Sequence, residues 1–186
     1  IQPQPPHLIS GLLVTGADVS GDSLTSVMEE VRALPGLASA AVARLGDGAH
    51  EMLASVEPDR PLAIGSAFKL FILAELSRQV GAGERHWNDV VTLDRRSIPS
   101  GVLQTWPQGS PLTVHSLAAL MISQSDNTAT DMLLHLAGRE NVERMMTTIG
   151  LESAARTRPF LSTLEVATLK TAPDAAVQAW RAADEA

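Results

Sequence analysis

Cysteine is absent from this 186-residue chain, and lysine occurs only twice, as Lys69 and Lys170. Without cysteine the chain cannot form a disulfide, a zinc–thiolate site or a thiol nucleophile. Long hydrophobic runs are missing too. The longest, residues 64–76, is interrupted by Lys69 and Glu75 and is shorter than the roughly 20 residues that cross a bilayer. We therefore expect no membrane-spanning segment.

Positive charge is scarce. The chain has 14 Lys and Arg against 21 Asp and Glu, a net charge of −7 and a pI of about 5.1. A nucleic-acid partner calls for a basic face, so this composition argues against one. Apolar residues make up 45% and charged residues 19%, which is typical of a globular domain of ordinary size.

The five histidines are scattered, with no metal-ligand spacing such as H-x-x-x-H; they are His7, His50, His86, His115 and His135. We expect no metal site and no cofactor.

Apolar periodicity and turn residues predict a short extended segment, a helix and a hairpin before the longest apolar run. The extended segment covers residues 7–16. The helix covers residues 21–36, with Asp22 or Ser23 as its cap, and the hairpin covers residues 37–57.

Helices dominate the rest of the chain. The predicted helices cover residues 66–80, 113–123, 127–138, 139–150, 162–170 and 174–186, and the connection between the first two is long and irregular. Strands and helices do not alternate, which argues against a doubly wound parallel sheet and for an α+β fold.

A serine and a lysine lie one helical turn apart in the most apolar helix. Ser66 lies at its predicted start, where the helix dipole and free N–H groups are close, and Lys69 falls on the same face. A lysine in low dielectric loses proton affinity and can take the proton of a serine that attacks a carbonyl. The backbone N–H of Ser66 is a candidate oxyanion donor. The alternative is that Ser66 caps the helix and Lys69 extends to the surface.

A second cluster, Ser125-Asp126-Asn127, lies between two predicted helices. A hydroxyl there can relay a proton to a leaving group, and an amide can hold a substrate carbonyl. Each of these residue types also caps helices, so the cluster alone is compatible with a capping role.

Together the two clusters resemble the serine β-lactamase and penicillin-binding protein superfamily, whose signature is S-x-x-K, S-D-N and K-T-G. Residues 60–76 are most similar to the cephalosporin-esterase-like serine hydrolases of this fold. The resemblance implies that Ser66 is the acylated nucleophile, Lys69 its proton acceptor, Ser125 a proton relay and Asn127 a substrate-binding residue. It also implies a helical domain beside an antiparallel sheet, with two strands from the hairpin, and the site in the cleft between them.

The third motif is missing. Lys170-Thr171-Ala172 follows Ser125 too closely and lies in a predicted helix, whereas the family places K-T-G on a strand beyond Ala186. We therefore expect a β-lactamase/transpeptidase-like domain over residues 23–186, with the C-terminal part of the sheet absent. The proline-rich residues 1–22 read as a linker or extension, with a further domain before it.

The family's deacylating glutamate, in an E-x-x-L-N context, also has no match among Glu140, Glu143, Glu152 and Glu165. Glu165 instead completes a predicted capping box that begins at Ser162. We expect slow deacylation of a β-lactam and a small-molecule ester or β-lactam substrate.

Three alternatives stay open. The domain could be a non-catalytic penicillin-binding-like ligand-binding or regulatory module, or a D-alanyl-D-alanine peptidase. The stretch "GDSLT" at residues 21–25 also resembles the nucleophile block of GDSL-type esterases, with Asp47 and His50 as the only D-x-x-H. The β-lactamase-like resemblance implies an extracytoplasmic location.

Overall fold

The computed structural model describes residues 21–151 and 153–184, and the predicted extended segment at residues 7–16 lies outside these ranges. The chain divides into two compact units, with the boundary after Ala63. The predicted domain boundary after residue 22 stays a prediction.

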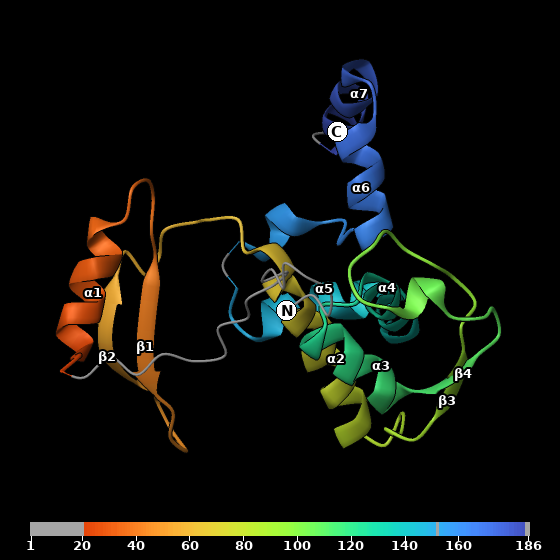
Figure 1. Cartoon of the computed structure of the whole chain (residues 1–186), viewed down its shortest axis with the longest axis horizontal. Coiled ribbons are helices and arrows are strands. Elements are labelled where there is room, and N and C mark those ends of the chain that lie inside the picture. Colours follow the sequence, from red (N-terminus) through yellow and green to blue (C-terminus); the bar gives the residue numbers. More distant parts are fainter. Residues whose placement is uncertain (1–20, 152, 185–186) are drawn as a thin grey trace, which may run out of the picture. The chain divides into compact units, whose positions relative to one another are not determined.

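The first unit is a helix and a hairpin, as predicted (Figure 1). It consists of α1 (Leu24–Ala33), β1 (Ala40–Arg44) and β2 (Glu51–Val56). The side chain of Ser23 accepts a hydrogen bond from the Ser26 backbone N–H and closes a capping box. The two strands pair antiparallel, with an irregularity between Val42 and Ala43.

The second unit is mainly helical, with one short two-stranded sheet (Figure 1). Its helices and strands are α2 (Lys69–Gly81), β3 (Val90–Thr92), β4 (Pro111–Thr113), α3 (Val114–Ser123), α4 (Asn127–Ala137), α5 (Arg139–Thr148), α6 (Thr163–Thr171) and α7 (Asp174–Asp184). Three 3₁₀ turns complete it: Gly65–Phe68, Leu103–Thr105 and Ala154–Thr157. The predicted caps Thr113 and Ser162 both accept the expected backbone hydrogen bonds.

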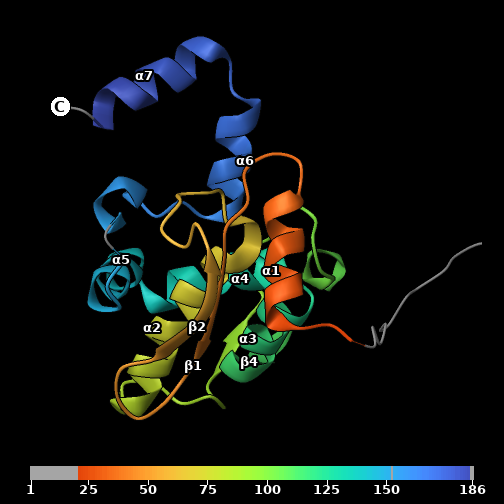
Figure 2. The same ribbon diagram turned by 90° about the vertical axis from the view of Figure 1, so that its left-hand side faces the viewer.

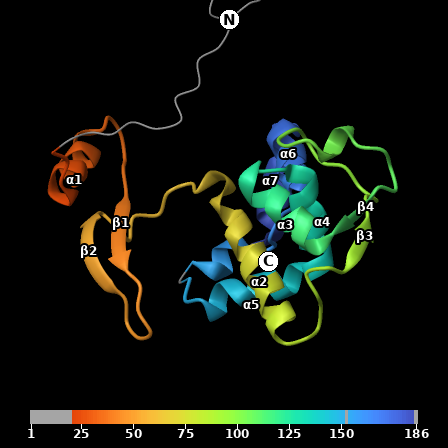
Figure 3. The ribbon, with the colours of Figure 1, turned by 60° about the horizontal axis from the view of Figure 1, so that its bottom comes forward.

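Helix α4 lies at the centre of this unit and packs against α2, α3, α5 and α6. The paired strands β3 and β4 lie beside α3 and α4 (Figure 3). The core between the helices is fully buried and includes Ile72, Leu76, Leu117, Leu133 and Met146. Each such side chain contributes about 1.5–3 kcal/mol when it leaves water, so the core fixes α2 against α4.

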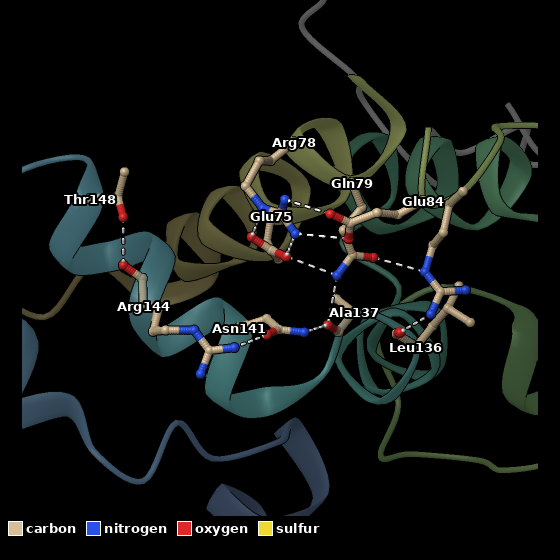
Figure 4. Close-up of polar contacts among 10 residues, drawn as sticks. Glu75, Arg78, Gln79, Glu84, Leu136, Ala137, Asn141, Arg144 and Thr148 are labelled. Atoms are coloured by element: carbon tan, nitrogen blue, oxygen red, sulfur yellow. Dashed lines mark hydrogen bonds and ion pairs between the residues drawn. The ribbon is translucent and has the colours of Figure 1, made fainter. Parts of the chain in front are cut away.

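Polar groups also join these helices at the end of α2 (Figure 4). The buried Glu75 accepts hydrogen bonds from Arg78 and Gln79, and Gln79 donates to the Ala137 carbonyl at 2.8 Å. Arg85 donates to the Leu136 carbonyl at 2.7 Å. These bonds satisfy carbonyls at the C-terminal end of α4, so they fix the axial position of α2 along α4.

Helices α6 and α7 extend from the α2–α5 bundle, and α7 continues at an angle beyond α6 (Figure 2). Asp131 of α4 fixes the start of α6. Its carboxylate accepts hydrogen bonds from the backbone N–H groups of Thr163 and Leu164, at 2.7 and 3.1 Å. Within residues 21–151 and 153–184, no helix is long and apolar enough to cross a membrane.

Candidate active site

Ser66 lies in the 3₁₀ turn Gly65–Phe68, not in the α-helix that follows. The prediction placed it at the start of a helix that runs directly from residue 66. Gly65 has a φ of +52°, a left-handed conformation that glycine adopts without strain. The backbone at Gly65 is therefore not α-helical. Helix α2 begins at Lys69, and its cap position, Phe68, makes no side-chain capping bond. Ser66 therefore does not cap α2, and its side chain is exposed.

Lys69 is 1% exposed, so it does not extend to the surface. Its Nζ donates to the Ser125 carbonyl at 2.6 Å, to the Ser125 Oγ at 2.8 Å and to the Asn127 Oδ1 at 3.0 Å. Desolvation by burial lowers the pKa of Lys69, against the opposing charges of Asp126 and Asp131. A lysine with a lowered pKa is available as a neutral base at a pH where an ordinary lysine is charged.

Ser125 lies between the other two side chains. Its Oγ donates a hydrogen bond to the Ser66 Oγ at 2.8 Å and accepts the one from Lys69. Ser125 adopts a left-handed φ of +54°, which is uncommon for a residue with a side chain. Among the described residues, no hydrogen bond joins Lys69 directly to Ser66. The sequence placed both side chains on one helix face, and the structure connects the pair through a second hydroxyl.

Asp126 supports the position of its neighbour Ser125. The sequence indicated only a helix-capping role for Asp126. It is fully buried and caps α4 through the Ala129 N–H at 2.9 Å. Its other carboxylate oxygen accepts the N–H groups of Val102 and Leu103, at 2.6 and 2.9 Å. The segment around residue 102 is therefore part of the site's support, and nothing in the local sequence pattern indicated it.

Asn127 begins α4 with its side-chain oxygen committed to Lys69. Its Nδ2 makes one long contact, 3.4 Å, to the Pro99 carbonyl. The backbone N–H of Asn127 donates to the Ser100 carbonyl at 3.0 Å. Because Oδ1 is engaged, Nδ2 is the atom that is available to donate to a ligand.

The structure thus brings all four predicted site residues, Ser66, Lys69, Ser125 and Asn127, into one hydrogen-bonded cluster. The cluster joins two hydroxyls, an amide and a buried amine through hydrogen bonds. Within the described part of the chain, no group of three or more His, Asp or Glu side chains could hold a metal ion.

The sequence profile of the beta-lactamase enzyme family matches residues 23–183, from the start of α1 to the last residue but one of α7. The chain belongs to the beta-lactamase enzyme family. The matched range includes residues of both compact units.

Solved structures give the same fold. A beta-lactamase from Sphaerobacter thermophilus is 29% identical, with a TM-score of 0.57 over 68% of this chain and 48% of its own. The protein PBP-A, whose mutant is described as an acyl-enzyme complex with penicillin G, is 26% identical, with a TM-score of 0.56 over 69% of this chain and 49% of its own. A beta-lactamase from Chitinophaga pinensis is 21% identical, with a TM-score of 0.58 over 78% and 59%.

The chain therefore spans about half the length of these first two beta-lactamase-like structures. No curated protein matches it. The predicted α+β, β-lactamase/transpeptidase-like fold is confirmed.

The alternative nucleophile of the GDSL type has no support in the geometry. Ser23 uses its hydroxyl to cap α1, accepting the Ser26 N–H at 3.1 Å. Asp47 and His50 lie in the connection between β1 and β2, outside regular structure. Ser23 therefore keeps the capping role that the sequence also predicted.

Proposed function

We propose that this beta-lactamase-family chain acts by acylation of Ser66, with an ester or β-lactam as the acyl donor. The observation that carries the proposal is the unbroken hydrogen-bonded path from Lys69 through Ser125 to Ser66. Both hydrogen bonds in this path are 2.8 Å long, and one end is a buried amine.

This path can carry the proton of Ser66 through a complete acylation step. Once the Lys69 amine is neutral, the two hydroxyls rotate, so that Ser66 donates to Ser125 and Ser125 donates to the amine. As the Ser66 Oγ attacks the carbonyl carbon, its proton moves to Ser125, and the proton of Ser125 moves to Lys69. An O–C bond forms at Ser66, and the carbonyl carbon loses its bond to the leaving oxygen or nitrogen. Lys69 then returns the proton through Ser125 to the leaving group, which departs as an alcohol or amine.

Two further groups complete the proposed site. We assign the Nδ2 of Asn127 to the carbonyl of a substrate amide, because its Oδ1 is held by Lys69. We assign the backbone N–H of Ser66 as one oxyanion donor, at the start of the 3₁₀ turn.

We also propose that deacylation is slower than acylation. Three of the four predicted candidates for a deacylating base lie in the described ranges, and each has another role. Glu143 accepts the Phe160 N–H at 2.8 Å, and Glu165 is bound by Arg139 and by the Ser162 N–H. The side chain of Glu140 is 88% exposed on α5 and forms an ion pair with Arg144 at 3.9 Å. Glu152 lies outside the described residues.

Labelling tests the proposal directly. The chain is incubated with a fluorescent penicillin and, separately, with a 4-nitrophenyl ester, and the adduct is located by peptide mass spectrometry. We expect one adduct on Ser66 and none in the Ser66→Ala variant. Ser77→Ala is the matched control, because Ser77 is an exposed serine on α2.

The outcomes separate the candidate functions. An adduct with release of several equivalents of nitrophenol indicates an ester hydrolase, and an adduct without turnover indicates an acylated binding module. Labelling that persists in Ser66→Ala contradicts the nucleophile assignment. The extracytoplasmic location that the family resemblance implies stays a prediction.

A further inference from the structure

A pocket of about 540 Å³ lies in the helical unit next to the nucleophile turn. Ile64 and Phe68, two positions before and after Ser66, line it, and so does Asn127 of the proposed site. Small-molecule sites are typically about 300–1,000 Å³ in volume, so the pocket has room for a bulky group of a ligand that reacts at Ser66.

The walls of this pocket are mainly apolar. Aromatic side chains contribute from three separate segments: Phe68 and Phe71 near the start of α2, Phe160 before α6, and Trp180 on α7. The rings of Phe68 and Phe160 meet edge to face with centroids 5.9 Å apart. Such walls favour an aromatic or branched apolar group over a small or polar one.

Three cations, Arg156, Arg158 and Lys170, also line the pocket, whereas none of its described lining residues is acidic. This bias runs against the composition of the chain, in which acids outnumber bases by 21 to 14. Arg158 lies 4.0 Å from Glu143. Among the described residues, Arg156 and Lys170 have no carboxylate within 4 Å, so their charge is available to an anion.

We propose that this pocket selects the acyl half of the substrate, and that it favours an aromatic acyl group that carries a carboxylate. Arg156 and Lys170 are then specificity-determining residues that bind the carboxylate, while the aromatic walls bind the ring. This inference rests on the proposed acylation of Ser66 and names the class of donor that the same site takes.

Three esters test the charge preference. They are 4-nitrophenyl esters of phenylacetic acid whose para position carries a carboxylate, hydrogen or a trimethylammonium group. Acylation of Ser66 is followed by intact mass at low ionic strength. We expect the carboxylate ester to react about fivefold faster than the neutral one and the cationic ester to react slowest, as for exposed ion pairs. The preference should shrink in high salt.

Two variants locate the preference. In Arg156→Gln combined with Lys170→Gln, the ratio of carboxylate to neutral rates should fall to near one. In Trp180→Ala, the preference for phenylacetyl over acetyl esters should fall. Arg144→Gln, which removes an exposed cation of α5 outside the pocket, should keep both ratios. All of these residues are exposed, so the fold tolerates the changes.

A binding measurement separates this inference from the proposed function. 1,4-Phenylenediacetate should bind the Ser66→Ala variant, as measured by calorimetry, and more weakly when Arg156 and Lys170 are also replaced. Equal rates for the three esters would overturn the pocket's role. So would a ratio of carboxylate to neutral rates that stays unchanged in the double variant. Neither result would contradict the proposed acylation of Ser66. If no ester labels Ser66, the proposed function fails, and absent binding to Ser66→Ala then overturns the pocket as well.

Discussion

The Oγ atoms of Ser66 and Ser125 lie 2.8 Å apart, although 59 positions separate the two residues in the sequence. In the proposed acylation this contact sets the route of the Ser66 proton, because among the described residues the Lys69 amine bonds to Ser125 and not to Ser66. Ser125, in the turn before α4, thus lies between Ser66 and Lys69, which belong to one short segment.

Removal of the bridging hydroxyl should slow acylation. We expect Ser125→Ala to reduce the acylation rate by about 10²–10⁴, the usual contribution of a positioned proton-transfer group. Stopped-flow or quenched-mass measurements with a 4-nitrophenyl ester give the rate. Ser123→Ala is the control, since the exposed Ser123 hydroxyl bonds only to the Ala119 carbonyl of its own helix. An unchanged rate in Ser125→Ala would mean that Lys69 reaches Ser66 without the bridge.

The titration of Lys69 can be observed directly, because the chain has only two lysines. Labelling with ¹³C-lysine gives two side-chain NMR signals, and Lys170→Arg leaves the one from Lys69. Since burial lowers its pKa, Lys69 should titrate below the ordinary value of 10.5. The acylation rate of Ser66 should rise with pH through the same midpoint, because only the neutral amine accepts a proton. A midpoint at or above 10.5 would contradict the role of Lys69 as base.

The same shift predicts how stability depends on pH. Where the folded state has released the Lys69 proton and the unfolded state still holds it, the free energy of unfolding rises with pH. The rise should span the range from the lowered pKa of Lys69 up to 10.5. Tyrosine and cysteine, which also titrate there, are absent from the chain. Urea titrations from neutral pH to about pH 10 should show this slope in the wild type and lose it in Lys69→Met.

Gly101 should be intolerant of a side chain. Its φ is +89°, and a Cβ there would overlap the buried carboxylate of Asp126 that supports Ser125. Gly109 is the matched control, with a φ of +83° and open space around its Cβ position. Left-handed strain costs about 1–2 kcal/mol for each Gly→Ala change. Displacement of Asp126 should cost Gly101→Ala about 2 kcal/mol more, because charged hydrogen bonds are lost.

Urea denaturation of the two alanine variants provides the comparison. Gly101→Ala should also slow acylation, since Asp126 adjoins Ser125, whereas Gly109→Ala should not. Equal destabilisation of the two variants would show that Asp126 is not confined as the structure places it.

Glu165 should matter for stability and not for deacylation. Desolvation raises its pKa, but hydrogen bonds from Arg139 and Ser162 prevail and lower it. The contribution of ionised Glu165 to the free energy of unfolding is therefore present above the ordinary pKa of 4.5. It is lost as pH falls through the lowered pKa. Glu165→Gln should destabilise the fold by about 0.5–1 kcal/mol at neutral pH, a modest amount because the pair is partly exposed.

The lifetime of the acyl-enzyme checks the second half of this prediction. Decay of the Ser66 adduct, followed by mass, should be the same in Glu165→Gln, in the exposed-site control Glu140→Gln and in the wild type. A longer lifetime in Glu165→Gln alone would identify Glu165 as the deacylating base.

Local patterns in the sequence were sufficient to predict most elements. Thr113 and Ser162 were predicted as helix caps, and Ser23 was one of two candidates with Asp22. Each of the three serine and threonine side chains accepts the backbone bond that a cap requires. The hairpin also forms within its predicted range, residues 37–57. These features depend on neighbours within a few positions, so the sequence expresses them directly.

The sequence by itself determined the chemical inventory: one serine three positions before one of only two lysines, and a second serine followed by Asp126 and Asn127. The tertiary structure decided what that inventory forms. It buries Lys69, places Ser66 in a 3₁₀ turn, and inserts Ser125 between them. The physical reason is that α2 and α4 pack through a shared core. Contacts across 56 to 59 positions follow from that packing and not from any local period.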